Sequence, residues 1–151
     1  MKLLVQEKCD IRETEVIIRC QERDEEVDNL IIGIHSATKK IIGEKENGCS
    51  YQVSAVRVLY FEAVEGNVFA YLDKEVMRVR NTLYEIEESY SNNHFVRISK
   101  SAEVNLRAIK SISPDEGRRL RIRLTNNENL VVSKNYVSAL KKSLGMKEGS
   151  R

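Results

Sequence analysis

The spacing of hydrophobic positions changes from a helical to an alternating period at about residue 39 of this chain. Two short apolar stretches, at 3–5 and 15–20, come first and are predicted to form strands. A helix is predicted next, because acidic residues at 24–26 suit its positive end and precede an amphipathic stripe. The stripe consists of Val27, Leu30, Ile31 and Ile34. Residues 1–38 are therefore predicted to be a β-β-α appendage.

Beyond this appendage the pattern is one of short strands separated by turns. Glycine-containing turns at 46–48 and 65–67 divide apolar runs, as they do in antiparallel hairpins. The segments predicted as strands are 41–42, 51–53, 57–64, 68–72, 75–80, 95–98, 103–106, 109–113, 120–124 and 129–132. Their close spacing predicts a mainly β, mostly antiparallel core.

Two short helices are predicted within this β domain. Thr82 can cap the first, with Glu85 as its capping-box partner, and Asn92-Asn93 ends it. The second covers 136–144 and ends at Gly145.

The length of 151 residues suits one domain with a small addition. We expect the appendage at 1–38, the β domain at 39–147 and a tail at 148–151. Three cysteines, an odd number with no C-x-x-C pair, support neither a disulfide framework nor a zinc ribbon, and Cys20 is predicted to be a small buried residue. The sequence has no signal-peptide pattern and no apolar stretch of membrane-spanning length. It therefore predicts a cytoplasmic protein without membrane insertion.

Charge is divided unevenly along the chain. Residues 1–94 carry 12 basic and 18 acidic side chains, a net charge of −6, whereas 95–151 carry 13 and 5, a net charge of +8. The whole-chain value of +2 therefore describes neither part. A basic part indicates either a polyanionic partner or an ordinary solvated basic surface.

No pattern in the sequence indicates catalysis. The two histidines, His35 and His94, have no metal-ligand spacing to each other or to carboxylates, and there is no glycine-rich phosphate loop or nucleophile motif. We expect no enzyme activity, no cofactor and no metal site.

Several basic and polar residues lie where strands are predicted to end. Arg97, Ser99 and Ser101 share one side of an extended segment with Lys100 at or near its loop, and Lys134 and Asn135 lie between a strand and a helix. Such groups are either ordinary loop polarity or donors to DNA phosphates and base edges. A separate row, Arg119, Arg121 and Arg123, is either the solvated face of a strand or a stripe that contacts phosphates.

In order and spacing, five segments resemble the motifs of one family, the LytTR-type DNA-binding domain. Residues 59–67 resemble its Y-x-E-x-x-G-N motif, and 80–87 its T-L-x-x-L-E helix. Residues 95–105, FVRISKSAEVN, are similar to its most specific stretch, F-x-R-I-H-R-S-x-x-V-N. Residues 109–112 and 131–136 resemble its closing strand and V-S-R-x-Y motif, so the resemblance covers roughly residues 40–146.

The resemblance implies an elongated stack of small antiparallel sheets whose inter-strand loops enter successive major grooves and bend the DNA. Carried over to this chain, the first loop falls at Gly66-Asn67, the second at Lys100 and the third at Lys134-Asn135. The residues that flank the second loop are Arg97, Ser99 and Ser101.

The chain departs from the family pattern at two loop positions. Ser99-Lys100 replaces the common His-Arg, and Lys lacks the two-pronged guanidinium that discriminates guanine. Asn135 stands where relatives often have Arg, which shifts the expected base preference toward adenine.

The resemblance implies a sequence-specific regulator of bacterial transcription. Because only about 38 residues precede the domain, too few for a receiver of about one hundred residues, we expect the stand-alone subgroup. The expected partners are double-stranded DNA and a second copy on repeated half-sites. The apolar stripe of the N-terminal helix is expected to cover the β core, or else to bind a second copy or a regulatory protein. The alternative function is a protein-interaction or sensory module whose basic half binds an acidic partner.

Overall fold

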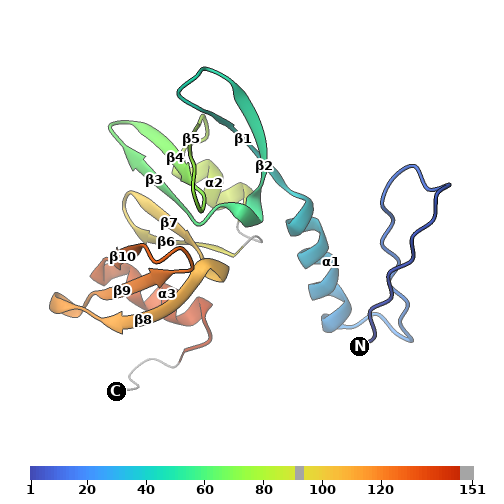
Figure 1. The fold of residues 1–151 in the computed structure, drawn as a ribbon. Helices are drawn as coiled ribbons and strands as arrows, with labels where there is room; N and C mark the ends of the chain where they lie inside the picture. The colour runs from blue at the N-terminus through green and yellow to red at the C-terminus, as the bar shows by residue number, and fades with distance from the viewer. Residues whose placement is uncertain (91–93, 147–151) are drawn as a thin grey trace.

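The computed structural model describes residues 1–90 and 94–146, which form two antiparallel sheets, three helices and an extended N-terminal stretch (Figure 1). The predicted fold class, mainly β with antiparallel sheets and short helices, is confirmed. The predicted helix end at Asn92-Asn93 and the predicted tail at 148–151 lie outside the described residues.

The larger sheet has seven strands, and every neighbouring pair is antiparallel. Its strands, in sheet order, are β2 (Ser50–Ser54), β1 (Lys40–Glu44), β5 (Val76–Val79), β4 (Asn67–Tyr71), β3 (Tyr60–Val64), β7 (Ala102–Asn105) and β6 (Phe95–Ser99). The first hairpin turns at Gly48, whose φ of +79° is readily accessible only to glycine. The run predicted as a strand from residue 57 becomes extended only at Tyr60, because a 3₁₀ turn occupies Ala55–Arg57.

The smaller sheet has the strand order β10 (Asn129–Val132), β9 (Leu120–Leu124) and β8 (Ile109–Pro114). Along β9 buried and exposed residues alternate strictly, so its leucines and isoleucine face inward and its arginines face solvent. The helix α3 (Val137–Ser143) follows β10 through a 3₁₀ turn at Lys134–Tyr136.

The helix α2 (Leu83–Ser89) begins with the predicted capping box. The Glu85 amide donates to the Thr82 hydroxyl at 3.2 Å, and the Thr82 amide donates to the Glu85 carboxylate at 2.9 Å. Leu83 and Ile86 are buried and pack with Phe61 and Phe95 of the larger sheet. Two otherwise unpaired amides at the helix start are thereby satisfied.

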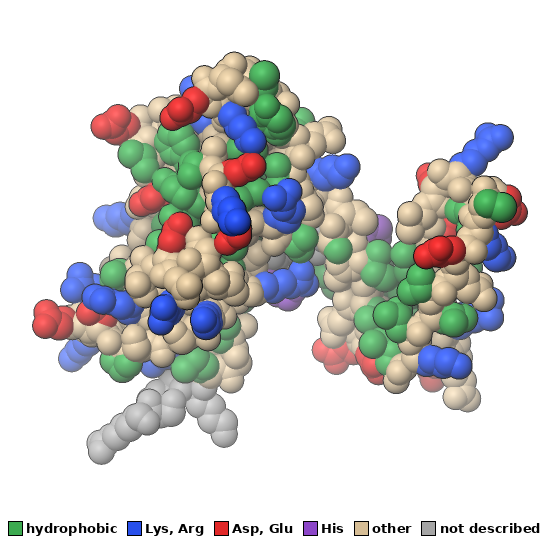
Figure 2. Space-filling model, in the orientation of Figure 1, with side chains coloured by type: hydrophobic (Ala, Val, Ile, Leu, Met, Phe, Trp, Pro, Cys, Tyr) green, Lys and Arg blue, Asp and Glu red, His purple; other side chains and the backbone are tan. Residues whose placement is uncertain are grey.

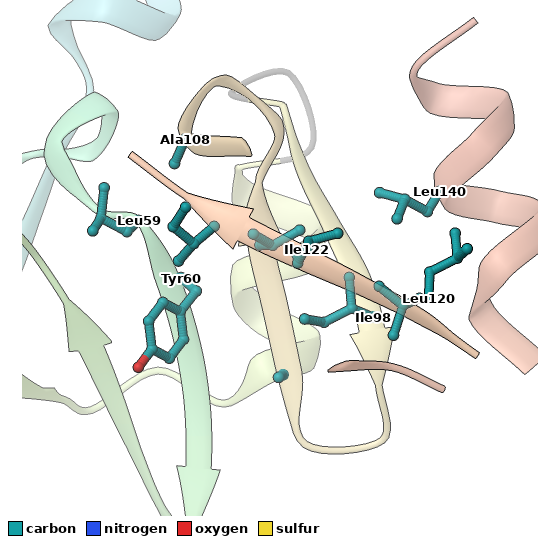
Figure 3. Close-up of a cluster of buried hydrophobic side chains, with 11 residues drawn as sticks. Leu59, Tyr60, Ile98, Ala108, Leu120, Ile122 and Leu140 are labelled. Atoms are coloured by element: carbon teal, nitrogen blue, oxygen red, sulfur yellow. The ribbon is translucent and has the colours of Figure 1, made fainter. Parts of the chain in front are cut away.

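A second buried cluster joins the two sheets to α3. Figure 3 shows Ile98 of β6, Ile122 of β9 and Leu140 of α3 gathered in this cluster. At its edge the Tyr60 hydroxyl donates to the Glu128 carboxylate at 2.9 Å, and the Tyr60 ring stacks on Tyr71 with centroids 4.3 Å apart. Burial and the neighbouring Glu128 raise the pKa of Tyr60. This shared core fixes the small sheet against the β6–β7 end of the large one.

The N-terminal part of the chain differs from the prediction. The strands predicted at 3–5 and 15–20 are absent, and residues 1–24 contain no helix or strand. An isolated pair of strands is only marginally stable in water, and no further strand of the described chain pairs with either segment. Cys20, predicted to be buried, is exposed.

The predicted amphipathic helix is present as α1 (Glu25–Thr38). Its stripe does not cover the β core, because the buried clusters among the described residues contain nothing before Ile41. The C-terminal end of α1 lies near the 3₁₀ turn at Ala55–Arg57, and the rest of the helix projects from the body (Figure 1).

Candidate nucleic-acid interface

The β6–β7 hairpin turns tightly at Lys100 and Ser101. The Ser101 amide donates to the Ser99 hydroxyl oxygen at 3.1 Å, and Ser99 pairs with Ala102 across the turn after a register shift. The hydroxyl groups of Ser99 and Ser101 thus make their hydrogen bonds within the turn. The Lys100 side chain is exposed at the tip and has no hydrogen bond or ion pair among the described residues.

Arg97 stabilises this turn from beneath. Its Nη1 donates to the Lys100 carbonyl at 2.8 Å, its Nη2 lies 3.3 Å from the Glu87 carboxylate, and its Nε lies 3.6 Å from Glu103 Oε1. The side chain is only 20% exposed. Predicted as part of the DNA-contacting set, Arg97 has its guanidinium engaged with protein groups in this structure.

Glu103 also belongs to this arrangement, although no sequence motif indicated it. It is 1% exposed, and neither carboxylate oxygen accepts a hydrogen bond from the residues described. Burial raises the pKa of Glu103 to about 7, although the nearby positive charge of Arg97 opposes the shift.

The third predicted loop, Lys134-Asn135, lies next to the second. The Ser133 amide donates to the Ile98 carbonyl at 2.9 Å, which ties the end of β10 to β6 just before Lys100. Both loop side chains are exposed and make no hydrogen bond or ion pair within 1–90 and 94–146. A groove of about 660 Å³ is lined by Lys100 and Arg97 on one side and Tyr136 on the other. The structure therefore brings the second and third loops together.

The first predicted loop, at Gly66-Asn67, lies at the same end of the large sheet as the second. Because β3 pairs antiparallel with β7, the end of β3 lies beside the start of β7, and the Ala63 amide donates to the Ser101 carbonyl at 2.8 Å. Figure 1 shows the β3–β4, β6–β7 and β8–β9 connections on the same side of the molecule. Glu65 and Gly66 form the turn with φ of +51° and +80°. This loop therefore presents an acidic side chain beside Asn67.

The arginine row of β9 lies on the exposed face of the small sheet. Asp115, at the end of β8, lies 3.8 Å from the Arg119 guanidinium and 3.7 Å from that of Arg121, whereas Arg123 makes no ion pair among the described residues. Figure 2 shows Lys and Arg side chains gathered over the part of the molecule that contains this sheet. The two open interpretations of this row, solvated face and phosphate stripe, both fit an exposed position.

Asn105 has a structural role that the motif alone did not reveal. It is 1% exposed, donates to the Val58 carbonyl at 3.0 Å and accepts from the Arg107 amide at 3.0 Å. Its amide group thus satisfies backbone groups of two segments that meet beside β7.

No catalytic or metal-binding arrangement accompanies these loops. In the part of the chain that the structure describes, no group of three or more His, Cys, Asp or Glu side chains could hold a metal ion. Nor is any described helix long and apolar enough to cross a membrane. The polar loops, the lysines and the arginine row instead provide hydrogen-bond donors and positive charge on one side of the molecule.

Comparison with known proteins defines the class. The family model of the LytTr DNA-binding domain matches residues 48–145, most of the chain. Residues 48–145 thus form a DNA-binding domain with a non-enzymatic regulator fold, as the prediction of no enzyme activity requires. The chain belongs to the LytTR family.

Two relatives agree with this assignment. The solved LytTr DNA-binding domain of a putative methyl-accepting/DNA response regulator from Bacillus cereus superposes with a TM-score of 0.68 at 26% identity, covering 72% of this chain and 99% of that one. The sensory transduction protein LytT of Enterococcus faecalis (strain ATCC 700802 / V583) is 27% identical over 96 residues, which are 64% of this chain and 40% of LytT. The match therefore spans two fifths of the length of that relative.

Proposed function

We propose that this protein is a sequence-specific DNA-binding regulator of transcription that reads successive major grooves through its inter-strand loops. One observation carries the proposal. The side chains of Lys100, Lys134 and Asn135 are exposed, have no partner within the described part of the chain, and lie on adjacent loops that backbone bonds hold together. Because the loop backbones are fixed, binding does not have to order the loops themselves, although it still immobilises the lysine side chains.

The three side chains have different roles in this proposal. Asn135 recognises adenine, since a side-chain amide can donate to N7 and accept from the N6 amino group in the pattern that the major groove presents. Lys100 and Lys134 donate to guanine acceptors or to phosphates, with less angular discrimination than arginine would give. Arg97 acts from beneath, because its guanidinium fixes the Lys100 carbonyl.

The remaining loop contributes differently. At the β3–β4 turn, Gly66 allows a close backbone approach and Asn67 supplies the polar side chain, while the exposed Glu65 weakens contact with phosphates. The arginines of β9 contact the DNA backbone, where they position the domain without reading sequence. Two copies bind two repeated half-sites.

Titration of DNA binding tests this proposal. Affinity for fragments of the DNA upstream of its own gene should fall steeply with salt while one sequence remains preferred. Lys100→Ala and Asn135→Ala should each reduce discrimination by about 1–3 kcal/mol, measured by fluorescence anisotropy with matched and scrambled fragments.

Lys74→Ala is the matched control. Lys74 is equally exposed but lies after β4, at the opposite end of the β3–β4 hairpin from the candidate loops. Unchanged discrimination in the Lys100 and Asn135 variants would overturn the loop assignment. Binding that never distinguishes sequences, or no DNA binding at low salt, would instead favour a module whose basic half binds an acidic protein.

A further inference from the structure

Residues 1–38, which we call the N-terminal arm, expose much apolar surface. Within it, eight large apolar side chains are 41–96% exposed, and none belongs to a core cluster. These are Met1, Leu3, Leu4, Val5, Ile11, Val16, Ile17 and Ile32. Single exposed apolar residues are ordinary, but so many in one short segment mark a surface that binds something.

The extended part of the arm before α1 pairs with no strand. Residues 1–23 make no backbone–backbone hydrogen bond recorded among the described residues, although 3–5 and 15–20 have the composition of strands. Extended segments with free amides and carbonyls readily pair with another chain. Residues 3–5 and 15–20 therefore could form strands but have no strand to pair with in a single copy.

Charge identifies the partner. The arm carries five basic and nine acidic side chains, a net charge of −4 that disfavours DNA as its partner, so a basic group facing its acidic end in a dimer has to come from just beyond the arm. Acidic residues lie at the start of α1, at Asp24 and Glu25, whereas the exposed Lys40 comes two residues after its end; Lys39 instead contacts the Ser89 carbonyl and the Tyr90 ring of its own chain. Two such helices packed antiparallel place each acidic end beside a basic end and oppose their dipoles favourably. A surface that is complementary to itself is suited to a two-fold dimer.

The amount of surface is sufficient for such a dimer. Full burial of a large apolar side chain removes on the order of 100 Å² from water, so the eight side chains, about two thirds exposed on average, provide on the order of 500 Å². Stable interfaces bury roughly 800 Å² from each partner, of which about two thirds is apolar in homodimers. The arm leaves the body on the side away from the candidate DNA loops, so the two surfaces do not overlap (Figure 1).

We propose that the N-terminal arm is a homodimer interface, in which α1 and the apolar segments before it pack antiparallel against the arm of a second copy. This inference deepens the proposed binding to repeated half-sites and rests on the proposed function in that respect. The dimer itself is tested without DNA.

Sedimentation velocity of the full chain over a range of concentrations tests the interface. We expect a monomer–dimer equilibrium with a micromolar Kd, which Ile17→Asp weakens at least tenfold. Ile17 is 71% exposed in the single chain, so this change does not disturb its fold. Ile42→Asp is the matched control, since Ile42 is 60% exposed on β1, outside the arm, and its variant should dimerise normally. A wild-type chain that remains monomeric at high concentration, or an equally tight Ile17→Asp dimer, would overturn the inference.

A charge exchange tests the antiparallel arrangement. Glu25→Lys and Lys40→Glu should each weaken the dimer, because each brings like charges together in both halves of the interface. An equimolar mixture should regain wild-type affinity, since the mixed dimer has both attractive pairs. A mixture as weak as either variant alone would contradict the arrangement.

The native thiols give an independent measurement. Cys9 and Cys20 lie in the arm and Cys49 lies in the β1–β2 turn, and all three are exposed in the single chain. As protein concentration rises, reaction of Cys9 and Cys20 with a maleimide should slow relative to that of Cys49. Equal reactivity of all three at every concentration would argue against burial of the arm.

A DNA readout separates this inference from the proposed function. Ile17→Asp should bind a single half-site with wild-type affinity but lose the cooperative gain on a fragment with two half-sites. If the wild-type protein binds no DNA, the proposed function fails, and sedimentation still decides the dimer. If DNA binding is intact and both proteins are monomeric, only the dimer inference fails.

Discussion

Replacement of the buried Glu103 by glutamine should change how the stability of this protein depends on pH. The carboxylate is 1% exposed, accepts no hydrogen bond among the described residues, and lies 3.6 Å from Arg97 Nε. Burial raises the pKa of Glu103 from 4.5 to about 7. The folded protein thus holds a proton on this group over a pH range in which the unfolded chain has released it.

The sign and size of the effect follow from proton linkage. Between pH 4.5 and about 7 the folded state binds more protons than the unfolded state at Glu103, so the free energy of unfolding falls as pH rises. The contribution of the neutral carboxyl is complete below pH 4.5 and is lost as pH rises through about 7. At about 1.4 kcal/mol for each pH unit, the total loss is about 3 kcal/mol.

Urea denaturation from about pH 5 to about pH 8 measures this loss. Glutamine keeps the shape of the side chain but does not titrate, so Glu103→Gln should be more stable than wild type at high pH, by up to about 3 kcal/mol, with a difference that shrinks toward low pH. The matched control is Glu87→Gln, which removes the other carboxylate beside Arg97: it should keep the loss of stability with rising pH but move it to lower pH, because the charge of Glu87 contributes to the raised pKa of Glu103. Parallel pH curves for wild type and Glu103→Gln would refute the reasoning.

Two further predictions concern DNA affinity. Arg121→Ala should weaken matched and scrambled DNA equally and reduce the slope of log affinity against log salt by about 1, because a phosphate contact carries no sequence information. A selective loss for the matched site would mean that Arg121 reads bases. Glu65→Gln should strengthen binding to both fragments several-fold at low salt, with a difference that vanishes at high salt. Equal affinity at every salt concentration would show that the β3–β4 turn lies away from the DNA.

The β domain could be predicted because its local signals and its packing agree. Leu120, Ile122 and Leu124 alternate with arginines on a strand that has one buried and one solvated face, and such a pattern has one interpretation. The start of α2 at Thr82 was equally clear, since the capping box depends on only four neighbouring residues. The glycine at position 48, where the backbone has a positive φ, likewise indicated where the first hairpin turns.

The arm could not be predicted in the same way. Strand propensity depends on what a segment packs against, and residues 3–5 and 15–20 have no partner in the described chain. The apolar run around Cys20 likewise indicates burial only if something covers it. Sequence patterns report a tendency toward burial, whereas the identity of the covering surface is a property of the fold or of an assembly.

The pairing of Arg97 with the buried Glu103 was not predicted, for a different reason. All four residues of β7 are buried, so the alternation that assigns charged residues to solvent does not hold there. A regular two-residue turn at Lys100-Ser101 would pair Arg97 with Val104, and only the register shift between Arg97 and Ser99, which no sequence pattern indicated, brings Arg97 opposite Glu103. Opposite charges in register across a buried hairpin indicate an internal ion pair.

At position 103, the requirements of a stable fold and of a firmly held DNA-contacting loop conflict. A neutral residue at 103 would stabilise the fold, since a buried carboxylate without hydrogen bonds costs more than its ion pair returns. Arg97 would then be held by one carboxylate, that of Glu87, which is 49% exposed and therefore screened by salt. Above about pH 7 an ionised Glu103 adds a second carboxylate beside Arg97, and because it is 1% exposed, its attraction for Arg97 is screened by salt far less than that of Glu87. The position of the loop should then depend less on ionic strength than the affinity of its lysine for DNA does.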